Sequence, residues 1–294
     1  MTVVYPYPEV LASRGATESS AMIAGSDTHW WTYSAGTDAP TIVLIHGFRG
    51  DHHGLELFAC ALSEYTVIVP DLPGFGSSSP FENASHGIED FGHWLRAFLA
   101  HTGTATAPVL GHSFGSIVVA CGLRGEREAP IVLVNPIAQP ALEGPNRIAT
   151  RVASLWYEIG ARIPVKQGLA MLSWPVMVRA MSVLMAKTKD KPLRKWIHSQ
   201  HDMYFSSFMD REALLGAYYA SVSANVGQFA SEILAPTLLI AAELDDITPV
   251  SVQRELHEKF LNADIHVIPG SGHLVHYEEP ILVAQHIREY LASV

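Results

Sequence analysis

Short apolar runs that recur along the chain constrain its fold more than any other feature of the sequence. They are rich in Val, Ile and Leu and lack polar alternation, so each predicts a strand buried on both faces. Segments with helical spacing lie between them, which is typical of a parallel α/β sheet. The sequence therefore predicts an α/β fold in which helices flank a mostly parallel, twisted sheet. The predicted strands are 41–45, 66–69, 108–110, 131–134, 236–241 and 265–268, and the predicted helices are 55–62, 88–100, 251–260 and 281–291.

The alternation is interrupted once, after Asn135 and Pro136. The chain beyond them has a helical pattern, is rich in aromatic residues and holds six of the eight methionines. One stripe at i, i+4, i+7 and i+8 is typical of an amphipathic helix and consists of Met177, Met181, Leu184 and Met185. We therefore predict a core formed by residues 1–136 and 229–294, with a helical cap inserted over 137–228.

The N-terminal residues indicate little regular secondary structure. Residues 1–20 show no periodicity and predict an irregular arm, followed by a hairpin over 22–33. The first residues lack both a basic segment and a long apolar segment, so we expect no signal peptide. The most apolar window, 168–186, is interrupted by Pro175 and Arg179, which argues against a transmembrane helix. We accordingly expect a cytoplasmic protein without stable membrane insertion.

Composition excludes several classes of function. With 48% hydrophobic and 16% charged residues, the chain is typical of a packed globular protein and not of a disordered one. A net charge of −10 argues against nucleic acid and other strongly anionic partners, because an acidic surface repels them. Only Cys60 and Cys121 occur, both in apolar runs, and we expect buried, reduced thiols. The sequence leaves open whether the protein is a monomer or a homodimer.

The run 109–115 holds the motif Gly-x-Ser-x-Gly, centred on Ser113. A predicted strand leads into it and a helix-compatible run, 116–120, follows. Small residues two places either side of a serine let a strand and a helix pass closely at a sharp turn. Such a turn lifts the hydroxyl out of the fold and directs the amide end of the helix toward it. This context favours a nucleophilic serine over a purely structural turn.

A nucleophilic serine needs a base and a group that orients the base. His273 is the best base, because it closes a Gly-Ser-Gly-His turn just past the last predicted strand. Asp245 is the best orienting acid, just past the preceding strand, while Asp246 is the second choice and Glu243 a weaker one. Parallel strands end at one edge of a sheet, where these loops would meet Ser113. Taken singly, His273 could be a surface histidine and Asp245 a helix cap, but their shared placement favours a Ser–His–Asp site.

The chain resembles the α/β-hydrolase superfamily over almost its whole length, and within it the serine enzymes with a helical cap. Their nucleophile, acid and histidine follow each other in the order found here. Two further segments match that family: 46–48 (His-Gly-Phe) and 71–77 (Asp-Leu-Pro-Gly-Phe-Gly-Ser). Asp245 stands four residues before Pro249, which is the family's spacing and favours it over Asp246.

The resemblance implies a role for each of these residues. Ser113 would attack a carbonyl while His273 takes its proton, and Asp245 would hold the imidazole. The backbone N–H groups of Phe48 and Phe114 would bind the developing oxyanion. The resemblance implies no cofactor and no metal.

The favoured function is hydrolysis of a carboxylic ester, or of a thioester, of a small and largely apolar molecule through an acyl-enzyme. A serine nucleophile argues against the dehalogenase and epoxide-hydrolase relatives, which use aspartate. Carbon–carbon bond hydrolases are the closest alternative, although their usual Gly-rich oxyanion loop and the Trp after the histidine are replaced by 47–49 (Gly-Phe-Arg) and Leu274. Acyl transfer, perhydrolysis and a non-catalytic ligand-binding role also stay open.

Several residues are expected to line or support the site. Flexible thioethers and large rings in the cap suit an apolar substrate of variable shape. His46 is expected to support the oxyanion loop, and His112 the turn at Ser113. The residues expected near the substrate are His46, Gly47, His112, Trp156, Trp174, Met177 and Met181.

Three polar segments receive a structural interpretation. Asp51, His52 and His53 resemble a metal cluster, but neighbours in a loop rarely point at one ion, so we expect them at the surface. The segment 71–78 is expected to be a packed turn. A basic group in the cap is expected to be a solvated edge, with attraction of an acidic substrate or a membrane surface as the alternative. This group consists of Lys187, Lys189, Lys191, Arg194 and Lys195.

Overall fold

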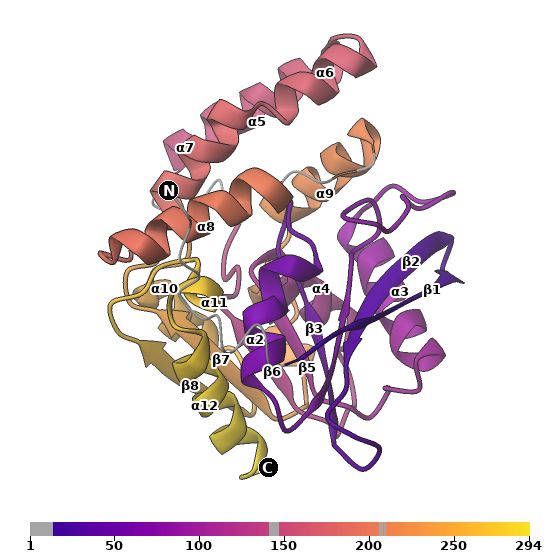
Figure 1. Cartoon of the computed structure of the whole chain (residues 1–294), viewed down its shortest axis with the longest axis vertical. Helices are drawn as coiled ribbons and strands as arrows, with labels where there is room; N and C mark the ends of the chain where they lie inside the picture. Colours follow the sequence, from indigo (N-terminus) through magenta and orange to yellow (C-terminus); the bar gives the residue numbers. More distant parts are fainter. Residues whose placement is uncertain (1–13, 141–146, 206–207, 209) are drawn as a thin grey trace.

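Eight strands form one sheet at the centre of the computed structural model, which describes residues 14–140, 147–205, 208 and 210–294 (Figure 1). The strands are β1 (Thr17–Ile23), β2 (Ser26–Tyr33), β3 (Thr41–Ile45), β4 (Thr66–Pro70), β5 (Val109–His112), β6 (Ile131–Val134), β7 (Thr237–Ala242) and β8 (Ala263–Ile268). Their order is β1-β2-β4-β3-β5-β6-β7-β8. The β1–β2 and β2–β4 pairs are antiparallel and all the others are parallel. The predicted mostly parallel α/β sheet is confirmed.

Helices cover both faces of the sheet and create two apolar cores. On one face lie α3 (Ile88–His101), α4 (Phe114–Gly122) and α10 (Val250–His257), and on the other lie α2 (Glu56–Ala61), α11 (Val275–Glu278) and α12 (Pro280–Leu291). Successive strand residues alternate between the cores, as Ile45 and Leu44 do. Because both sides are covered, the central strands are apolar throughout, which is the pattern that predicted them. Cys121 is buried in the first core and Cys60 in the second, as expected.

A helical insertion lies between β6 and β7, at one end of the sheet (Figure 1). It contains α5 (Arg147–Arg162), α6 (Val165–Leu172), α7 (Pro175–Met185), α8 (Lys191–Tyr204) and α9 (Arg211–Ser223). Asp190 caps α8 by accepting a hydrogen bond from the N–H of Leu193, at 3.1 Å, and so fixes where that helix begins. Pro175 occupies the first position of α7, where a helix needs no N–H donor, so it starts this helix and does not interrupt it. Short 3₁₀ turns complete the chain: η1 (His52–Leu55), η2 (Val226–Gln228) and η3 (Ala230–Glu232).

The apolar segment 165–185 overlaps the window in which the sequence analysis expected no transmembrane helix. By length and composition it is sufficient to cross a membrane, with a mean hydropathy of 1.5, although the sequence analysis judged the neighbouring window too interrupted. In the fold this segment is two helices, α6 and α7, separated at Ser173 and Trp174. Only 28% of its most apolar window is buried inside the protein, so much of its apolar surface is exposed.

The N-terminal hairpin is longer than predicted. β1 starts at Thr17, inside the segment expected to be irregular, and pairs with β2 from Thr17–Thr32 to Ile23–Ser26. Most of its side chains are exposed at the edge of the sheet, so the sequence has no apolar alternation there to reveal a strand. Residues 1–13 of the expected arm lie outside the described residues.

Candidate active site

Ser113 lies in a strained turn between β5 and α4. Its φ is 54°, in the left-handed region that residues other than glycine rarely adopt. A β-carbon on Gly115 would lie 2.3 Å from the carbonyl oxygen of Ile45, and one on Gly111 would lie 2.5 Å from that of Gly115. Both positions therefore require glycine. The N–H of Ser113 donates to the carbonyl of Val134 at 3.0 Å, which fixes the turn against β6.

The structure brings together the three residues singled out from the sequence. Ser113 Oγ lies 2.8 Å from His273 Nε2, and His273 Nδ1 lies 2.7 Å from Asp245 Oδ2. Because a carboxylate can only accept, Nδ1–H donates to Asp245 and Nε2 is left to accept from the serine hydroxyl. The neutral imidazole thus carries its proton on Nδ1 and presents the lone pair of Nε2 to the hydroxyl of Ser113.

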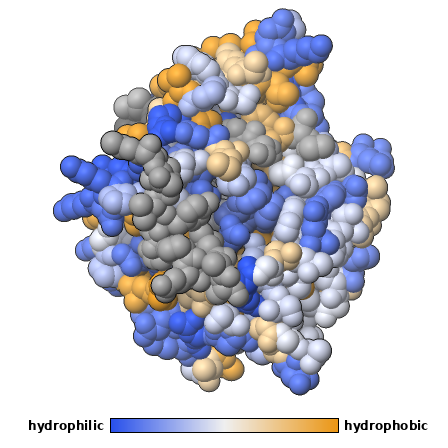
Figure 2. All heavy atoms as spheres, viewed as in Figure 1, coloured by the Kyte–Doolittle hydropathy of each residue, from blue (hydrophilic) through white to orange (hydrophobic). Residues whose placement is uncertain are grey.

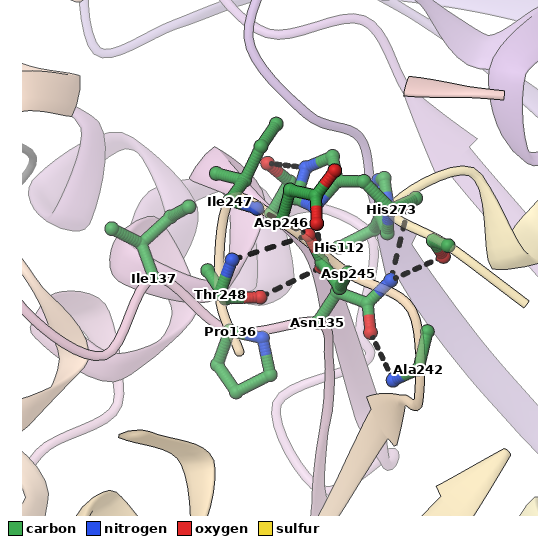
Figure 3. A network of polar contacts seen from close by, with 12 residues as sticks. His112, Asn135, Pro136, Ile137, Ala242, Asp245, Asp246, Ile247, Thr248 and His273 are labelled. Carbon is green, nitrogen blue, oxygen red and sulfur yellow. Dashed lines mark hydrogen bonds and ion pairs between the residues drawn. The ribbon is translucent and has the colours of Figure 1, made fainter. Parts of the chain in front are cut away.

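The Asp245 carboxylate is buried and fully hydrogen-bonded (Figure 3). Its Oδ1 accepts from the N–H groups of Ile247, at 2.8 Å, and Thr248, at 3.1 Å. Its Oδ2 accepts from His273 and from Thr248 Oγ1, the latter at 2.8 Å. Burial by itself raises the pKa of Asp245, but His273 and the donors of Thr248 outweigh burial and lower that pKa to about 2. The group is therefore ionised at neutral pH.

The two alternative acids occupy other positions. Asp246 forms an ion pair with Lys187 and its side chain is largely exposed. Glu243 accepts a hydrogen bond from the N–H of Gly270 at 2.8 Å. Asp245, and not Asp246, is thus the hydrogen-bond partner of His273 Nδ1.

The loop after β3 passes directly beside Ser113. His46 holds this loop, because its Nδ1 donates to the carbonyl of Gly47 at 2.8 Å and its Nε2 accepts from the N–H of Leu72 at 2.9 Å. Burial lowers the pKa of His46, so the ring stays neutral and can accept as well as donate. A β-carbon on Gly47 would lie 3.3 Å from Ser113 Cβ, which shows how closely the two loops approach.

Phe48 and Phe114, the residues whose N–H groups are predicted to bind the oxyanion, both line the cavity that contains Ser113. Phe114 is the first residue of α4, so its N–H has no acceptor within the helix. Phe48 follows Gly47 and lines the same cavity as Ser113 and Phe114. The two rings also contact each other edge to face, with centroids 6.2 Å apart. Their side chains therefore form part of the wall of the cavity.

A cavity of about 570 Å³ lies between the sheet and the helical insertion and contains Ser113 and His273 among its lining residues. The predicted residues His46, Gly47, His112, Trp156, Met177 and Met181 also line it. Trp174 is not among the lining residues, although its neighbour Trp156 is. It precedes α7, is 47% exposed and stacks on Trp156 with centroids 6.3 Å apart, because the methionine stripe is the side of α7 that faces the cavity.

Asn135 is a residue that the sequence analysis missed. It is fully buried at the end of β6 with a φ of 45°, and its Nδ2 donates to the carbonyls of Gly272, at 3.2 Å, and His273, at 3.1 Å (Figure 3). Its Oδ1 accepts from the N–H of Ala242 at 2.8 Å. His112 donates to the same carbonyl of His273 at 3.1 Å, and burial lowers the pKa of His112 to about 3. Both residues fix the histidine loop. The available signal was an Asn, a residue that tolerates positive φ, directly after a buried strand.

The cluster formed by Asp51, His52 and His53 is mostly buried, contrary to the surface position expected for it. Its possible ligand atoms lie within 4.8 Å of one another. One nitrogen of each ring already has a partner, since His53 Nδ1 lies 3.1 Å from Asp51 Oδ1 and His52 Nδ1 lies 2.9 Å from Asp71 Oδ1. Asp71 also accepts from the N–H of Ser77 at 2.8 Å, so segment 71–78 is a packed turn, as predicted. The cluster holds the loop after β3 against that turn.

Residues 42–286 match the family model described as "Alpha/beta hydrolase family". The chain belongs to this family. It is 26% identical over 297 residues to a monoacylglycerol lipase of Mycolicibacterium smegmatis, covering 97% of this chain and 99% of the relative. It is also 26% identical over 275 residues to a 2-hydroxy-6-oxononadienedioate/2-hydroxy-6-oxononatrienedioate hydrolase of Cupriavidus pinatubonensis, covering 88% and 89%. Its fold is similar to that of a thermophilic esterase from Thermogutta terrifontis, with a TM-score of 0.74, 24% identity and coverage of 95% and 99%.

Proposed function

We propose that this α/β-hydrolase cleaves a carboxylic ester of a small, largely apolar molecule through an acyl-enzyme on Ser113. The observation that carries the proposal is the continuous hydrogen-bonded chain from Ser113 through His273 to Asp245, at 2.8 and 2.7 Å. The cavity above it supports an apolar substrate, because its roof contains Leu172, Met177, Met181 and Leu184. The lipase of Mycolicibacterium smegmatis and the Thermogutta esterase support the reaction class.

The reaction would proceed in two halves. Ser113 Oγ attacks the ester carbonyl while His273 Nε2 takes its proton, and the oxyanion is bound by the N–H groups of Phe48 and Phe114. Collapse of this intermediate expels the alcohol, which receives the proton from His273. Water then attacks the acyl-enzyme and gives a proton to His273. When this second intermediate collapses, the acid is released and His273 returns the proton to Ser113 Oγ. Asp245 keeps the imidazole in the required tautomer and stabilises its protonated form.

Carbon–carbon bond hydrolysis is a second candidate, supported by the Cupriavidus relative with its dioate substrate. A dianionic substrate needs cationic partners in the cavity. The Lys and Arg side chains among the described lining residues are Arg49 and Lys187, and both are already engaged. Arg49 donates to Tyr157 Oη and to the carbonyl of Leu172, each at 2.8 Å, and Lys187 pairs with Asp246. This arrangement favours an uncharged ester over a dicarboxylate.

Turnover of two substrate classes separates the candidates. We expect hydrolysis of nitrophenyl esters of short to medium acyl chains and a much lower kcat/KM for a vinylogous diketone acid. A preference for the diketone acid would replace the ester proposal by the carbon–carbon one. Failure of both substrates to react in wild type, under conditions where the protein is folded, would favour a binding role instead.

A further inference from the structure

The outer side of the helical insertion is exposed and apolar. Val152, Leu155 and Ile159 follow one another at i, i+3 and i+7 on α5, so they share one side of that helix. Together with apolar residues of α6 and α7 they form what we call the outer cap face, whose members are between 43% and 66% exposed. This face consists of Val152, Leu155, Ile159, Val165, Val176 and Val183. Figure 2 shows hydrophobic residues gathered, with charged ones among them, at the end of the molecule where α5–α7 lie.

The same segment carries positive charge in an acidic protein. Residues 147–185, which hold α5–α7, contain five Lys or Arg and one Asp or Glu, a net charge of +4, which leaves −14 for the rest of the chain. Arg151 adjoins Val152 on α5, and Lys166 adjoins Val165 on α6. Both basic side chains are exposed, and neither forms an ion pair with a carboxylate among the residues that the structure describes. The charge distribution therefore directs this end of the molecule toward an anionic surface.

The helices of the outer cap face also form the roof of the cavity. Trp156 and Tyr157 on α5, and Met177 and Met181 on α7, line the cavity from the inner side. Leu184, also on α7, lines the cavity and is 62% exposed.

We propose that the outer cap face docks on a membrane surface that contains anionic lipid, with α5–α7 lying in the interface. Exposed apolar side chains flanked by Lys and Arg are typical of interfacial helices. A transmembrane position for 165–185 does not fit, because that segment is broken between α6 and α7 and one side of α7 lines the cavity. A two-fold contact with a second copy would bring two segments of net charge +4 together and is disfavoured by repulsion. The proposal goes beyond ester hydrolysis and does not depend on it.

The charge part is tested with the Ser113→Ala protein, so that binding is measured without turnover. We expect it to sediment with vesicles of phosphatidylglycerol and phosphatidylcholine, less so at high salt, and hardly with phosphatidylcholine alone. Replacing Arg151 and Lys166 by Gln should weaken partitioning by about 25-fold, since each basic residue near an anionic surface contributes about fivefold. The matched control replaces Arg254 and Lys259, which are exposed on or beside α10, and should change partitioning by less than about twofold.

The apolar part is tested in the same assay with exposed residues that play no part in the cavity. Leu155→Ser with Val183→Ser should weaken partitioning by about 10-fold or more, whereas Leu261→Ser with Ile281→Ser, equally exposed but remote from the insertion, should not. Thermal unfolding of all variants should match that of the parent, because the changed side chains are exposed. Equal binding to both vesicle types, binding to neither, or equal loss in variants and controls would overturn the proposal. So would a self-associated state that Leu155→Ser dissociates, which would assign the face to a second copy.

Discussion

Asp245→Asn changes the carboxylate that orients His273. The substitution preserves size but replaces one acceptor oxygen by a donating NH₂, while all contacts to this side chain come from donors: two backbone N–H groups, Thr248 Oγ1 and His273 Nδ1. If the remaining oxygen faces Ile247 and Thr248, the NH₂ faces His273. The imidazole must then carry its proton on Nε2 and present an N–H, not a lone pair, to Ser113. We expect a fall in kcat of about 10⁴-fold, equivalent to about 5 kcal/mol of activation free energy.

Asp245→Asn should also lower the free energy of unfolding. Lowering the pKa of Asp245 from 3.8 to about 2 contributes about 2 kcal/mol to the free energy of unfolding at neutral pH. Because the folded-state pKa is the lower one, this contribution is present above pH 4 and is lost as the pH falls toward 2. Urea unfolding of wild type and variant measures it, and nitrophenyl ester turnover measures kcat. Asp246→Asn is the matched control and should change kcat by less than about threefold, because its surface ion pair contributes little. A variant at 245 with more than a tenth of wild-type kcat would refute the reasoning.

Three further predictions concern the scaffold. Gly115→Ala should destabilise the fold by about 3 kcal/mol or more, because its β-carbon would lie 2.3 Å from the backbone oxygen of Ile45; normal urea unfolding would contradict this. Arg49→Met removes two hydrogen bonds that tie the loop after β3 to α5 and to the end of α6. The free energy of unfolding should fall by about 2–3 kcal/mol and KM should rise, whereas an unchanged KM would argue against a positioning role. Burial lowers the pKa of His201 to about 3, so as the pH falls below 6.5 the unfolded state takes up a proton before the folded state does. The free energy of unfolding should therefore fall by about 1.4 kcal/mol per pH unit between pH 6.5 and 3. His201→Phe should remove this contribution to the pH dependence of unfolding, and an unchanged pH dependence would contradict the assignment.

The sheet and the central residues of the site were predictable from local rules. Strands covered on both faces must be apolar throughout, which marked 41–45 and 131–134 without ambiguity. The strained turn at Ser113 requires small neighbours, and these stand in the sequence as Gly111 and Gly115. His273 was identifiable because its loop follows a parallel strand.

The remaining features depend on packing that no local pattern encodes. β1 lies at a sheet edge with exposed polar side chains, so its pairing left no periodic signal. His52 turns inward because Asp71, far away in the sequence, accepts from it. Trp174 has a large ring of the kind expected to line a cavity. It precedes α7, whose orientation turns the methionines toward the cavity and leaves this ring half exposed. The role of Asn135 could not be predicted from the sequence, because its hydrogen-bond partners belong to segments that are distant along the chain.

The central claim is that Ser113 is the nucleophile, and covalent labelling tests it most directly. A fluorophosphonate probe should modify wild type once per chain, and mass spectrometry should place the label on the peptide that contains Ser113. Ser113→Ala should take up no label and lose about 10⁵-fold or more of ester turnover, with unchanged thermal unfolding. Label found on another residue, or ester turnover in Ser113→Ala equal to that of wild type, would contradict the account.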